Sequence, residues 1–362
     1  MAGCTVLVTA DRRSAEITSA LQRRGAQVLH APALSIVPHV DDEALLVATR
    51  RLLADPPDVV VATTGIGFRG WVEAADAAGL ATDLLAALGR ARLVARGPKA
   101  RGAIQAAGLQ ADWVAESETA AEVTQWLLTE GVDGLHVAVQ HHGAGSDGVD
   151  EALRAAGARV TPVVVYRWGP PPDPAALTAS VHATADGEVD AVVFTSAPGA
   201  AAWLTAARRA GRLDDLAHAC AAGELVAAAV GPVTAVPLAE AGMVPLVPER
   251  GRLGALLRTL VSHFAERPGI ATAAGTLHLR RGAAVLDGRV LPLSPGGLAV
   301  LRRLAADEGA VVPRGALLDV LPGGSDDPHA VEVAVARLRD AAGCRDLVST
   351  VVKRGYRLGV AG

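Results

Sequence analysis

The stretches DVVVATTGIGFRGWVEAA (58–75) and DAVVFTSAPGAAAWLTAA (190–207) decide the fold of this chain. They align at an offset of 132 residues, and ALQRRGAQV (20–28) aligns with ALRAAGARV (152–160) at the same offset. RGPKA (96–100) matches VGPVT (230–234) after a shift of two more residues. These three matches indicate an internal duplication, so we expect two similar domains within the first 265 residues.

Each half alternates short β-branched runs with Ala- and Leu-rich segments of helical length, as in TVLVT followed by SAEITSALQRRG. Continuous apolar strands separated by helices predict a parallel sheet with helices on both faces. The stiffest break, GPPPDP (169–174), has PALSIVP (32–38) as its counterpart. This pair predicts a two-stranded hinge between two lobes, and we expect a small ligand to bind in the cleft between them.

The composition indicates a globular protein of two or three domains. The chain has 362 residues, 51% of them hydrophobic and 20% charged. Its start, MAGCTVLVTADRR, predicts a buried strand and lacks the basic-then-apolar order of a signal peptide. The three cysteines (Cys4, Cys220, Cys344) are odd in number and far apart, which argues against a disulfide framework and favours a cytoplasmic location.

Charge is distributed unevenly along the chain. Residues 1–266 hold 21 Lys/Arg and 29 Asp/Glu, a net of −8, whereas residues 267–362 hold 13 and 9, a net of +4. The split predicts an acidic body carrying a small basic module, and basic modules favour polyanionic partners.

Two stretches match the G-x-G-x-x-G pattern of dinucleotide sites, GIGFRG (65–70) and GAGSDG (143–148). The first follows an expected strand, but no acidic residue ends a strand about 20 positions later, and its repeat partner APGAAA (197–202) has lost the pattern. We therefore favour a tight strand-to-helix turn over a nucleotide site. Free N–H groups at such a helix start would also suit a carboxylate.

His141 and His142 raise the alternative of a metal site. Adjacent histidines point apart on a strand and the sequence places no third ligand, so we expect a solvated loop there and no metal. The sequence contains no G-x-S-x-G or other nucleophile motif.

The body resembles uroporphyrinogen-III synthase over about residues 3–265. The resemblance rests on DAVVFTS, Val165-Tyr166-Arg167, VGPVTA, PALSIVP and PERGRLGALLRTL (248–260) in this order and spacing. It implies two α/β lobes, the first from 1–36 with 168–265 and the second from 37–167. It also implies cofactor-free closure of linear hydroxymethylbilane, which bears eight carboxylates, into uroporphyrinogen III.

The resemblance assigns roles to individual residues. Tyr166 matches the tyrosine thought to assist loss of the substrate hydroxyl, and its phenol could donate a proton to the leaving oxygen. A strand tyrosine that only packs its ring is the alternative. Ser196 and Thr234 match hydroxyl positions of the cleft, and Thr64 is the equivalent in the other lobe. The residues expected to line the ligand cleft are Thr64, Gly65, Lys99, Ser196 and Thr234.

The basic module after a 266–274 linker reads as strands, three helices and a hairpin. Asp287-Gly288 predicts a hairpin turn, and Ser294-Pro295 predicts a helix start. Asp327-Pro328 predicts the start of the third helix, HAVEVAVARLRDAAG (329–343), with Val331, Val335 and Leu338 facing inward.

The module, expected at residues 275–362, resembles over about residues 275–360 the OmpR-type winged helix, an output domain of bacterial response regulators. VARLRD and STVVKRGYRL carry the resemblance together with the S-P helix start. It implies that the third helix enters the major groove of double-stranded DNA while the hairpin lies on the adjacent backbone. The expected DNA contacts are Arg314, His329, Arg337, Arg339, Lys353, Arg354 and Tyr356. The first strand ends in Ala10-Asp11-Arg12-Arg13 and not in an acidic pair, so a phosphoreceiver is not expected.

Two functions remain open. We favour a DNA-binding transcriptional regulator whose synthase-like body senses a small anionic ligand, with a linear tetrapyrrole as one candidate, or acts as a scaffold. The alternative is an active uroporphyrinogen-III synthase, a hydro-lyase, with an appended DNA-binding domain. The first is favoured because reading DNA adds nothing to ring closure, and because Ala10 and Val233 stand where the family often has other residues. No membrane partner is expected, and a homodimer on DNA stays an open alternative.

Overall fold

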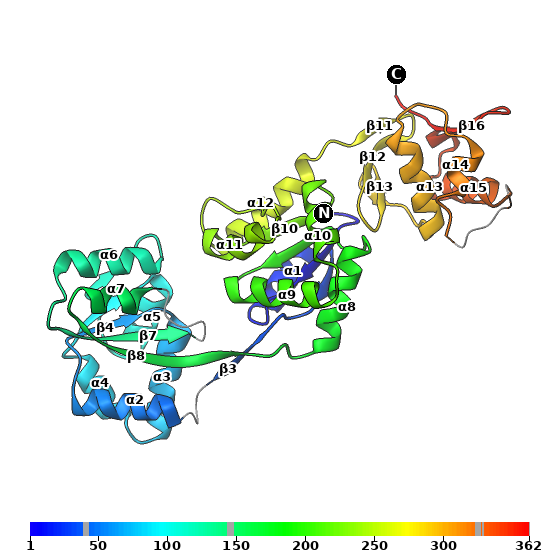
Figure 1. Cartoon of the computed structure of the whole chain (residues 1–362). Coiled ribbons are helices and arrows are strands. Elements are labelled where there is room, and N and C mark those ends of the chain that lie inside the picture. The colour runs from blue at the N-terminus through cyan, green and yellow to red at the C-terminus, as the bar shows by residue number, and fades with distance from the viewer. Residues whose placement is uncertain (39–42, 143–147, 323–326, 328, 362) are drawn as a thin grey trace. The chain divides into compact units, whose positions relative to one another are not determined.

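The computed structural model describes residues 1–38, 43–142, 148–322, 327 and 329–361. The chain forms two compact units. The first unit is Met1–Leu34 with Pro171–Gly362, and the second is Ser35–Pro170 (Figure 1). The division into two lobes, a linker and a DNA-binding domain at the residues given above stays a prediction.

The second unit is built on a six-stranded sheet of order β3-β8-β7-β4-β5-β6. All neighbouring strands are parallel except β3, which runs antiparallel to β8. In chain order its elements are β3 (Ser35–Pro38), α2 (Glu43–Ala54), β4 (Val59–Ala62), α3 (Gly65–Ala77), α4 (Ala81–Leu88), β5 (Arg92–Ala95), α5 (Pro98–Ala106), β6 (Trp113–Val114), α6 (Ala120–Glu130), β7 (His136–His142), α7 (Val149–Ala155) and β8 (Arg159–Gly169).

The apolar strands of this unit bury side chains on both faces, as continuous valine runs predict. Val60 and Ala62 of β4 pack with α2, α3, α4 and α5, while Val59 and Val61 pack with α6 and α7. The alternation of side chains along a strand therefore divides the core into two layers.

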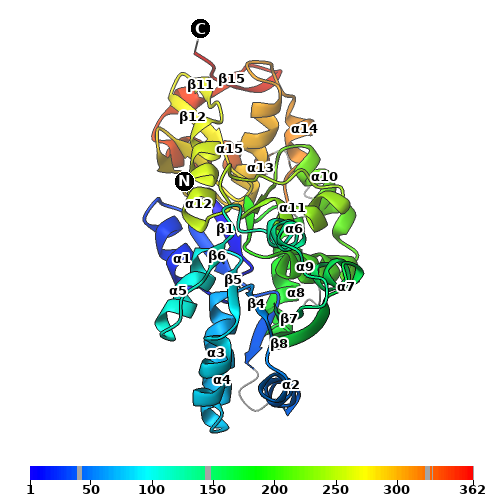
Figure 2. The same ribbon diagram turned by 90° about the vertical axis from the view of Figure 1, so that its left-hand side faces the viewer.

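The first unit contains a four-stranded parallel sheet of order β10-β9-β1-β2. This sheet and its helices are called the first lobe below. Its elements are β1 (Thr5–Val8), α1 (Ser14–Gln22), β2 (Gln27–His30), α8 (Pro174–Ala185), β9 (Ala191–Phe194), α9 (Ala197–Arg209), α10 (Leu213–Ala221), β10 (Val226–Ala229), α11 (Pro232–Glu240) and α12 (Leu253–Glu266). Helices α1 and α12 cover one face, and α8 to α11 cover the other (Figure 2).

The two parallel sheets repeat one arrangement, which confirms the predicted fold class. Strand β4 lies between β5 and β7, and the equivalent β9 lies between β10 and β1. Trp71 and Trp203 occupy equivalent places in α3 and α9, and both are fully buried. Each packs edge-on against a phenylalanine, Phe68 and Phe194 respectively.

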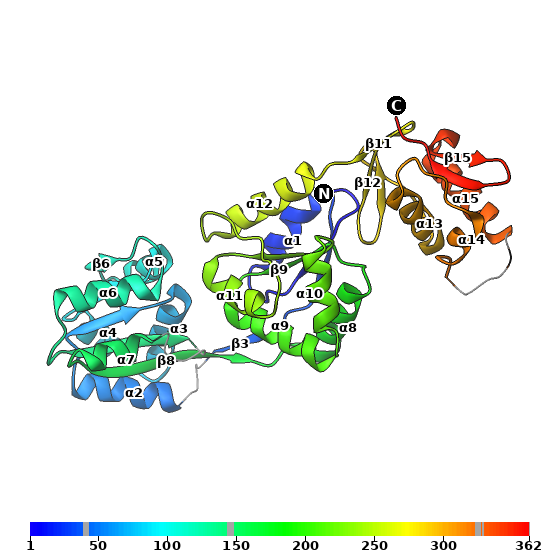
Figure 3. The same cartoon turned by 45° about the horizontal axis from the view of Figure 1, so that its top comes forward.

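The rest of the first unit is the winged-helix domain, residues 270–361. Its elements are β11 (Ile270–Thr272), β12 (Gly275–Leu279), β13 (Ala284–Leu286), β14 (Arg289–Val290), α13 (Pro295–Ala306), α14 (Arg314–Leu318), α15 (His329–Ala342), a 3-10 turn (Arg345–Leu347), β15 (Val348–Val351) and β16 (Gly355–Leu358). Strands β11 to β14 form an antiparallel sheet, and β15 pairs with β16 beside α15 (Figure 3).

Local sequence signals of this domain act as expected. Asp287 and Gly288 both have positive φ, at 47° and 81°, and they join β13 to β14. The Ser294 hydroxyl accepts a hydrogen bond from Gly297 N, and Pro295 begins α13. Val331, Val335 and Leu338 of α15 are buried in the domain core, as their spacing predicts. None of the helices in the described residues is both long enough and apolar enough to cross a bilayer.

Candidate functional site

In the second unit, Thr64 begins α3 at the carboxyl end of β4. Its hydroxyl oxygen accepts hydrogen bonds from Gly67 N at 3.1 Å and from the Gln140 side-chain amide at 3.1 Å. The Thr63 hydroxyl donates to the Gln140 carbonyl at 2.6 Å. Gln140 is fully buried and its Oε1 has no partner among the described residues. The threonine pair and Gln140 therefore hold the helix start against β7.

The glycines of the first G-x-G-x-x-G stretch serve close packing. A Cβ on Gly65 would lie 2.2 Å from the Lys99 carbonyl oxygen, and one on Gly67 would lie 2.1 Å from Gln140 Nε2. Both distances are far below van der Waals contact, so a side chain at either position would displace a neighbour. The geometry supports the tight-turn interpretation. Most of the second stretch, residues 143–147, lies outside the described residues.

Lys99 is exposed in the first turn of α5, which begins at Gly97-Pro98 without a side-chain cap. The Lys99 side chain therefore begins beside the N–H groups of the first turn of α5, which have no partner within the helix and favour anions. Tyr166 belongs to β8, where it pairs with Pro38 of β3. The Tyr166 side chain lies outside the described part of the structure.

The first lobe repeats this pair of helix starts. The Ser196 hydroxyl caps α9 by accepting Gly199 N at 3.2 Å, as Thr64 caps α3. Gly231-Pro232 begins α11 without a side-chain cap, as Gly97-Pro98 begins α5. Thr234 follows in the first turn of α11 and is buried. The structure thus groups Thr64, Gly65 and Lys99 in the second unit, and Ser196 and Thr234 in the first.

The expectation of a solvated loop at His141 is wrong. His141 lies in β7, is 6% exposed, and its Nε2 is 2.8 Å from Oδ1 of the buried Asp150. Arg154 Nη2 is 3.5 Å from the other Asp150 oxygen. His141 belongs to the strand because β7 pairs with β8 along its whole length. No cluster of three metal-ligating side chains occurs within the described residues.

In the winged-helix domain, the outer side of α15 carries polar side chains. His329 and Arg337 are exposed, on the side opposite the buried valines. Glu332, which the sequence reading omitted, lies 3.3 Å from both Arg314 Nη2 and His329 Nδ1. Its carboxylate therefore orients two of the expected DNA contacts.

Two of the expected DNA contacts face the protein. Arg339 donates through Nε and Nη2 to the Val348 carbonyl and through Nη2 to the Thr350 hydroxyl, at 2.6 to 2.8 Å. Tyr356 is 4% exposed, and the Arg314 guanidinium lies 5.9 Å from its ring centroid. These contacts make Arg339 a support of the hairpin and Tyr356 a core residue. They argue against direct DNA contact by the Arg339 guanidinium or by the Tyr356 ring.

The β15–β16 hairpin, the wing of this domain, presents its cations at the turn. Lys353 and Arg354 are exposed, and Lys353 has the positive φ of 62° that the turn requires. Gly355 has φ 137°, and a Cβ there would lie 2.1 Å from the Val312 carbonyl oxygen. The glycine therefore fixes the hairpin against the domain and leaves the two cations free of the core.

Comparison with known proteins identifies the body. The family described as uroporphyrinogen-III synthase HemD matches residues 15–258, two thirds of the chain. The chain belongs to the uroporphyrinogen-III synthase family. A mutant uroporphyrinogen-III synthase from the extremely thermophilic bacterium Thermus thermophilus is 29% identical, with a TM-score of 0.60, and covers 73% of this chain and 100% of its own.

Two curated proteins are also similar to this chain. An uncharacterised protein of Bacillus subtilis, YjjA, is 28% identical over 266 residues, which is 73% of this chain and 97% of that protein. A putative uroporphyrinogen-III synthase of Methanothermobacter thermautotrophicus is 27% identical over 257 residues, 70% of this chain and 96% of its own. Each match spans nearly the whole of the relative and less than three quarters of this chain.

The basic module matches a second family. The family described as "Transcriptional regulatory protein, C terminal" matches residues 288–358. This chain is therefore a fusion of a uroporphyrinogen-III synthase domain with an OmpR-type DNA-binding domain, as the resemblances implied.

Residues that join this synthase-family body to the DNA-binding domain were not predicted from the sequence. Asp190 of the first lobe is 1% exposed, and its two carboxylate oxygens accept the backbone N–H groups of Thr5 and Arg281. Burial raises the pKa of Asp190, while the two N–H groups act in the opposite direction. The one available signal was the aspartate that begins both repeats, Asp58 and Asp190.

Proposed function

We propose that this protein is a DNA-binding transcriptional regulator whose synthase-family body is a ligand-sensing or scaffold module. The observation that carries the proposal is the combination of an exposed cationic wing with direct bonding of its domain to the first lobe. Lys353 and Arg354 are exposed on the wing, and Arg281 of the same domain bonds Asp190 of the lobe.

The DNA side of the proposal rests on charge and exposure. His329 and Arg337 occupy the open side of α15, the helix that enters the major groove in this class of domain. Arginine to guanine is the commonest specific contact in that groove, and lysine and arginine at the wing suit phosphates. The bound partner is double-stranded DNA. A homodimer on DNA is the form that a two-part operator would require.

The sensing side rests on the helix starts. Four helices begin at the carboxyl ends of β4, β5, β9 and β10, two in each unit, and their N–H groups favour anions. Thr64 and Ser196 add hydroxyl groups, and Lys99 adds a cation. A carboxylate-bearing small molecule fits these groups, and a linear tetrapyrrole is one such ligand.

The second candidate is an active uroporphyrinogen-III synthase. It is favoured by the hydroxyl-capped helix starts that both units retain, and by the presence of a tyrosine, Tyr166, in β8. Under this proposal Tyr166 assists loss of the substrate hydroxyl, no cofactor takes part, and the DNA-binding domain regulates or localises the enzyme.

One set of measurements separates the two candidates. The full chain is supplied with hydroxymethylbilane, and formation of the type III isomer is compared with spontaneous closure to type I. Operator affinity is measured in parallel, with and without the linear tetrapyrrole, after an operator has been selected from random duplexes. The variants are Tyr166→Phe and Thr234→Ala, and Thr205→Ala on the exposed side of α9 is the matched control.

The regulator proposal predicts a selected operator and a ligand-dependent affinity that Thr234→Ala reduces and Thr205→Ala leaves unchanged. Such couplings are typically about 1–3 kcal/mol. Type III turnover that Tyr166→Phe lowers about 100-fold, with no effect of ligand on DNA affinity, would instead establish the synthase. A selected operator with neither turnover nor a ligand effect leaves the body a scaffold.

A further inference from the structure

A cavity of about 450 Å³ lies where the first lobe meets the winged-helix domain, wholly within the first unit. Its walls come from the end of α8 and the turn into β9, from Gly223-Glu224, from Arg267 after α12, and from Leu279–Arg281 and Arg302 of the winged-helix domain. The volume is in the range that small-molecule sites occupy, about 300–1,000 Å³. The cavity is separate from the helix starts described above.

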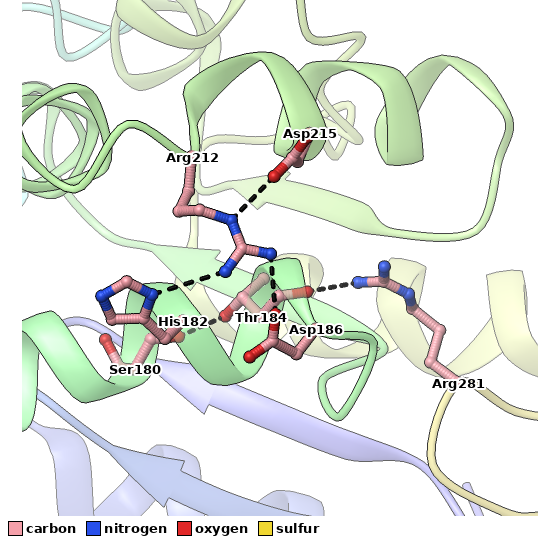
Figure 4. Close-up of polar contacts among 7 residues, drawn as sticks. All are labelled: Ser180, His182, Thr184, Asp186, Arg212, Asp215 and Arg281. Atoms are coloured by element: carbon pink, nitrogen blue, oxygen red, sulfur yellow. Dashed lines mark hydrogen bonds and ion pairs between the residues drawn. The ribbon is translucent and has the colours of Figure 1, made fainter. Parts of the chain in front are cut away.

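Four arginines line this cavity, Arg267, Arg280, Arg281 and Arg302. Each donates to backbone carbonyls: Arg267 to Gly223, Arg280 to Phe264, Arg281 to Thr184 and Val189, and Arg302 to Arg280 and Arg281. Figure 4 shows Arg281 reaching the Thr184 carbonyl at the end of α8, 2.6 Å away. None of the four forms an ion pair with a carboxylate of the described residues. A guanidinium has five donors, so these carbonyls leave most of them unused.

Arg280 is the most enclosed of the four. It is 9% exposed, and its Nε is buried without a partner among the described residues. The guanidinium groups of Arg280 and Arg267 lie 5.3 Å and 5.5 Å from the Phe264 ring centroid, so the same ring contacts both cations. Burial lowers the pKa of Arg267, and the nearby charge of Arg280 lowers it further. A buried donor without a protein partner and two cations beside one ring are features that favour binding of an anion.

The carboxylates at the cavity form no ion pair with these arginines among the described residues, although the charge of Asp190 acts on all four of them. Both oxygens of Asp190 already accept backbone N–H groups. Asp186 is bound by Arg212, which also bonds Asp215 and contacts His182 (Figure 4). Glu224 is exposed. The cavity lining therefore contains four arginines and two carboxylates, Asp190 and Glu224, that are not in an ion pair within the described part of the chain. The third carboxylate, Asp186, is paired with Arg212.

We propose that the Arg267, Arg280, Arg281 and Arg302 cavity binds a small multivalent oxyanion that bridges the first lobe and the winged-helix domain. Guanidinium groups bind phosphate and carboxylate oxygens in pairs of parallel hydrogen bonds, so either chemistry suits the site. The bound anion contacts Arg267, which follows the lobe's last helix, and Arg302 of α13. It would therefore hold the two domains together and tie the position of the DNA-binding domain to the level of a metabolite. This inference does not depend on the helix-start ligand proposed above.

Calorimetric titration of the full chain tests the proposal, with pyrophosphate as the phosphate probe and citrate as the carboxylate probe at fixed ionic strength. We expect one site per chain for at least one probe, and the tighter probe identifies the chemistry. Arg267→Gln and Arg302→Gln should each weaken binding about 10-fold or more, because each removes charge-assisted hydrogen bonds. Arg209→Gln, an exposed arginine of α9, is the matched control and should bind as wild type does.

Arg302 also bonds the β12–β13 turn, so Arg302→Gln could fail to fold. In that case Arg267→Gln decides, together with Arg267→Lys, which keeps the charge and loses the paired geometry and should fall between wild type and Arg267→Gln. The proposal is overturned if neither probe binds at millimolar concentration, if Arg267→Gln binds like wild type, or if Arg209→Gln weakens binding equally. Displacement of the probe by a short DNA duplex in proportion to occupancy would also overturn it, because the arginines would then belong to the DNA interface.

Discussion

The carboxylate of Asp190 accepts the backbone N–H of Arg281 at 2.7 Å, across 91 residues of sequence. Its other oxygen accepts Thr5 N at 2.8 Å, which joins the starts of β9 and β1. Asp58 is the equivalent residue of the other repeat, and it is exposed. Its carboxylate accepts the N–H of the neighbouring strand, His136 N at 2.8 Å, and within the described residues it has no bond like the one from Arg281. The duplication supplied the strand-joining aspartate, and the winged-helix domain buried one copy of it.

Asp190→Ala should destabilise the protein far more than Asp58→Ala. The first change leaves two partly buried N–H groups without an acceptor, at about 1–3 kcal/mol each, whereas the second leaves one N–H group that is bound by an exposed aspartate. Urea denaturation, followed by tryptophan fluorescence, measures the free energy of unfolding of both variants. Equal shifts of the midpoint would mean that the junction with the winged-helix domain contributes nothing to stability.

Gly65→Ala and Gly70→Ala should have opposite effects, although both lie in α3. A Cβ at Gly65 meets the Lys99 carbonyl, whereas a Cβ at Gly70 meets nothing within 4 Å. We expect Gly65→Ala to cost about 1–3 kcal/mol by overpacking and Gly70→Ala to stabilise by up to about 1 kcal/mol through helix propensity. Thermal denaturation of the two variants tests this, and a neutral Gly65→Ala would contradict the close approach of α3 to α5.

Two of the three thiols should resist alkylation in the native protein. Burial raises the pKa of Cys4 and of Cys220 to about 11, so a fraction of only about one in a thousand is thiolate at pH 8. Cys344 is partly exposed. Iodoacetamide at pH 8 should therefore label Cys344 first, as read by mass spectrometry of peptides, and labelling of the other two should require unfolding. Early modification of Cys4 in folded protein would show that β1 opens locally.

Removal of the wing cations should weaken binding to every DNA sequence alike. The double variant Lys353→Ala/Arg354→Ala removes two positive charges that suit phosphates, and the slope of log affinity against log salt should fall by about 0.9 for each phosphate that is no longer neutralised. The matched control is Arg208→Ala/Arg209→Ala, which removes the same charge from the exposed end of α9. An equal decrease of DNA affinity in the two double variants would mean that only the net charge matters and that the wing does not contact DNA.

Substitution of Arg337 and of Arg339 should have different effects, because Arg337 is expected to contact bases and Arg339 supports the wing. Arg337→Ala removes an exposed side chain of α15 and should relax preference at one base pair, by about 1–3 kcal/mol. Arg339→Ala removes the bonds to Val348 and Thr350, so it should lower stability and weaken all sequences equally. Binding-site selection with each variant, together with its melting temperature, distinguishes these outcomes. A changed base preference in Arg339→Ala with unchanged melting would reverse the two assignments.

The sequence alone determined the architecture, because the signals involved are local. Apolar strand runs, the Ser294-Pro295 helix start and the Asp287-Gly288 turn each depend on neighbouring residues, and a repeat at a fixed offset reports a duplicated domain. The inward valines of α15 followed from helical periodicity in the same way.

Tertiary structure decided which polar groups are buried and what they contact. The sequence predicted Tyr356 and Arg339 as DNA contacts. In the structure an isolated β-bridge joins Tyr356 to Val312, and Arg339 of α15 bonds Val348 and Thr350 of β15. His141 meets Asp150 only because α7 packs on β7. The arginine cavity draws on segments near residues 185, 224, 267, 280 and 302, each of which reads as an ordinary charged surface by itself. Burial and pairing of charges depend on contacts between distant segments, and a local pattern does not record them.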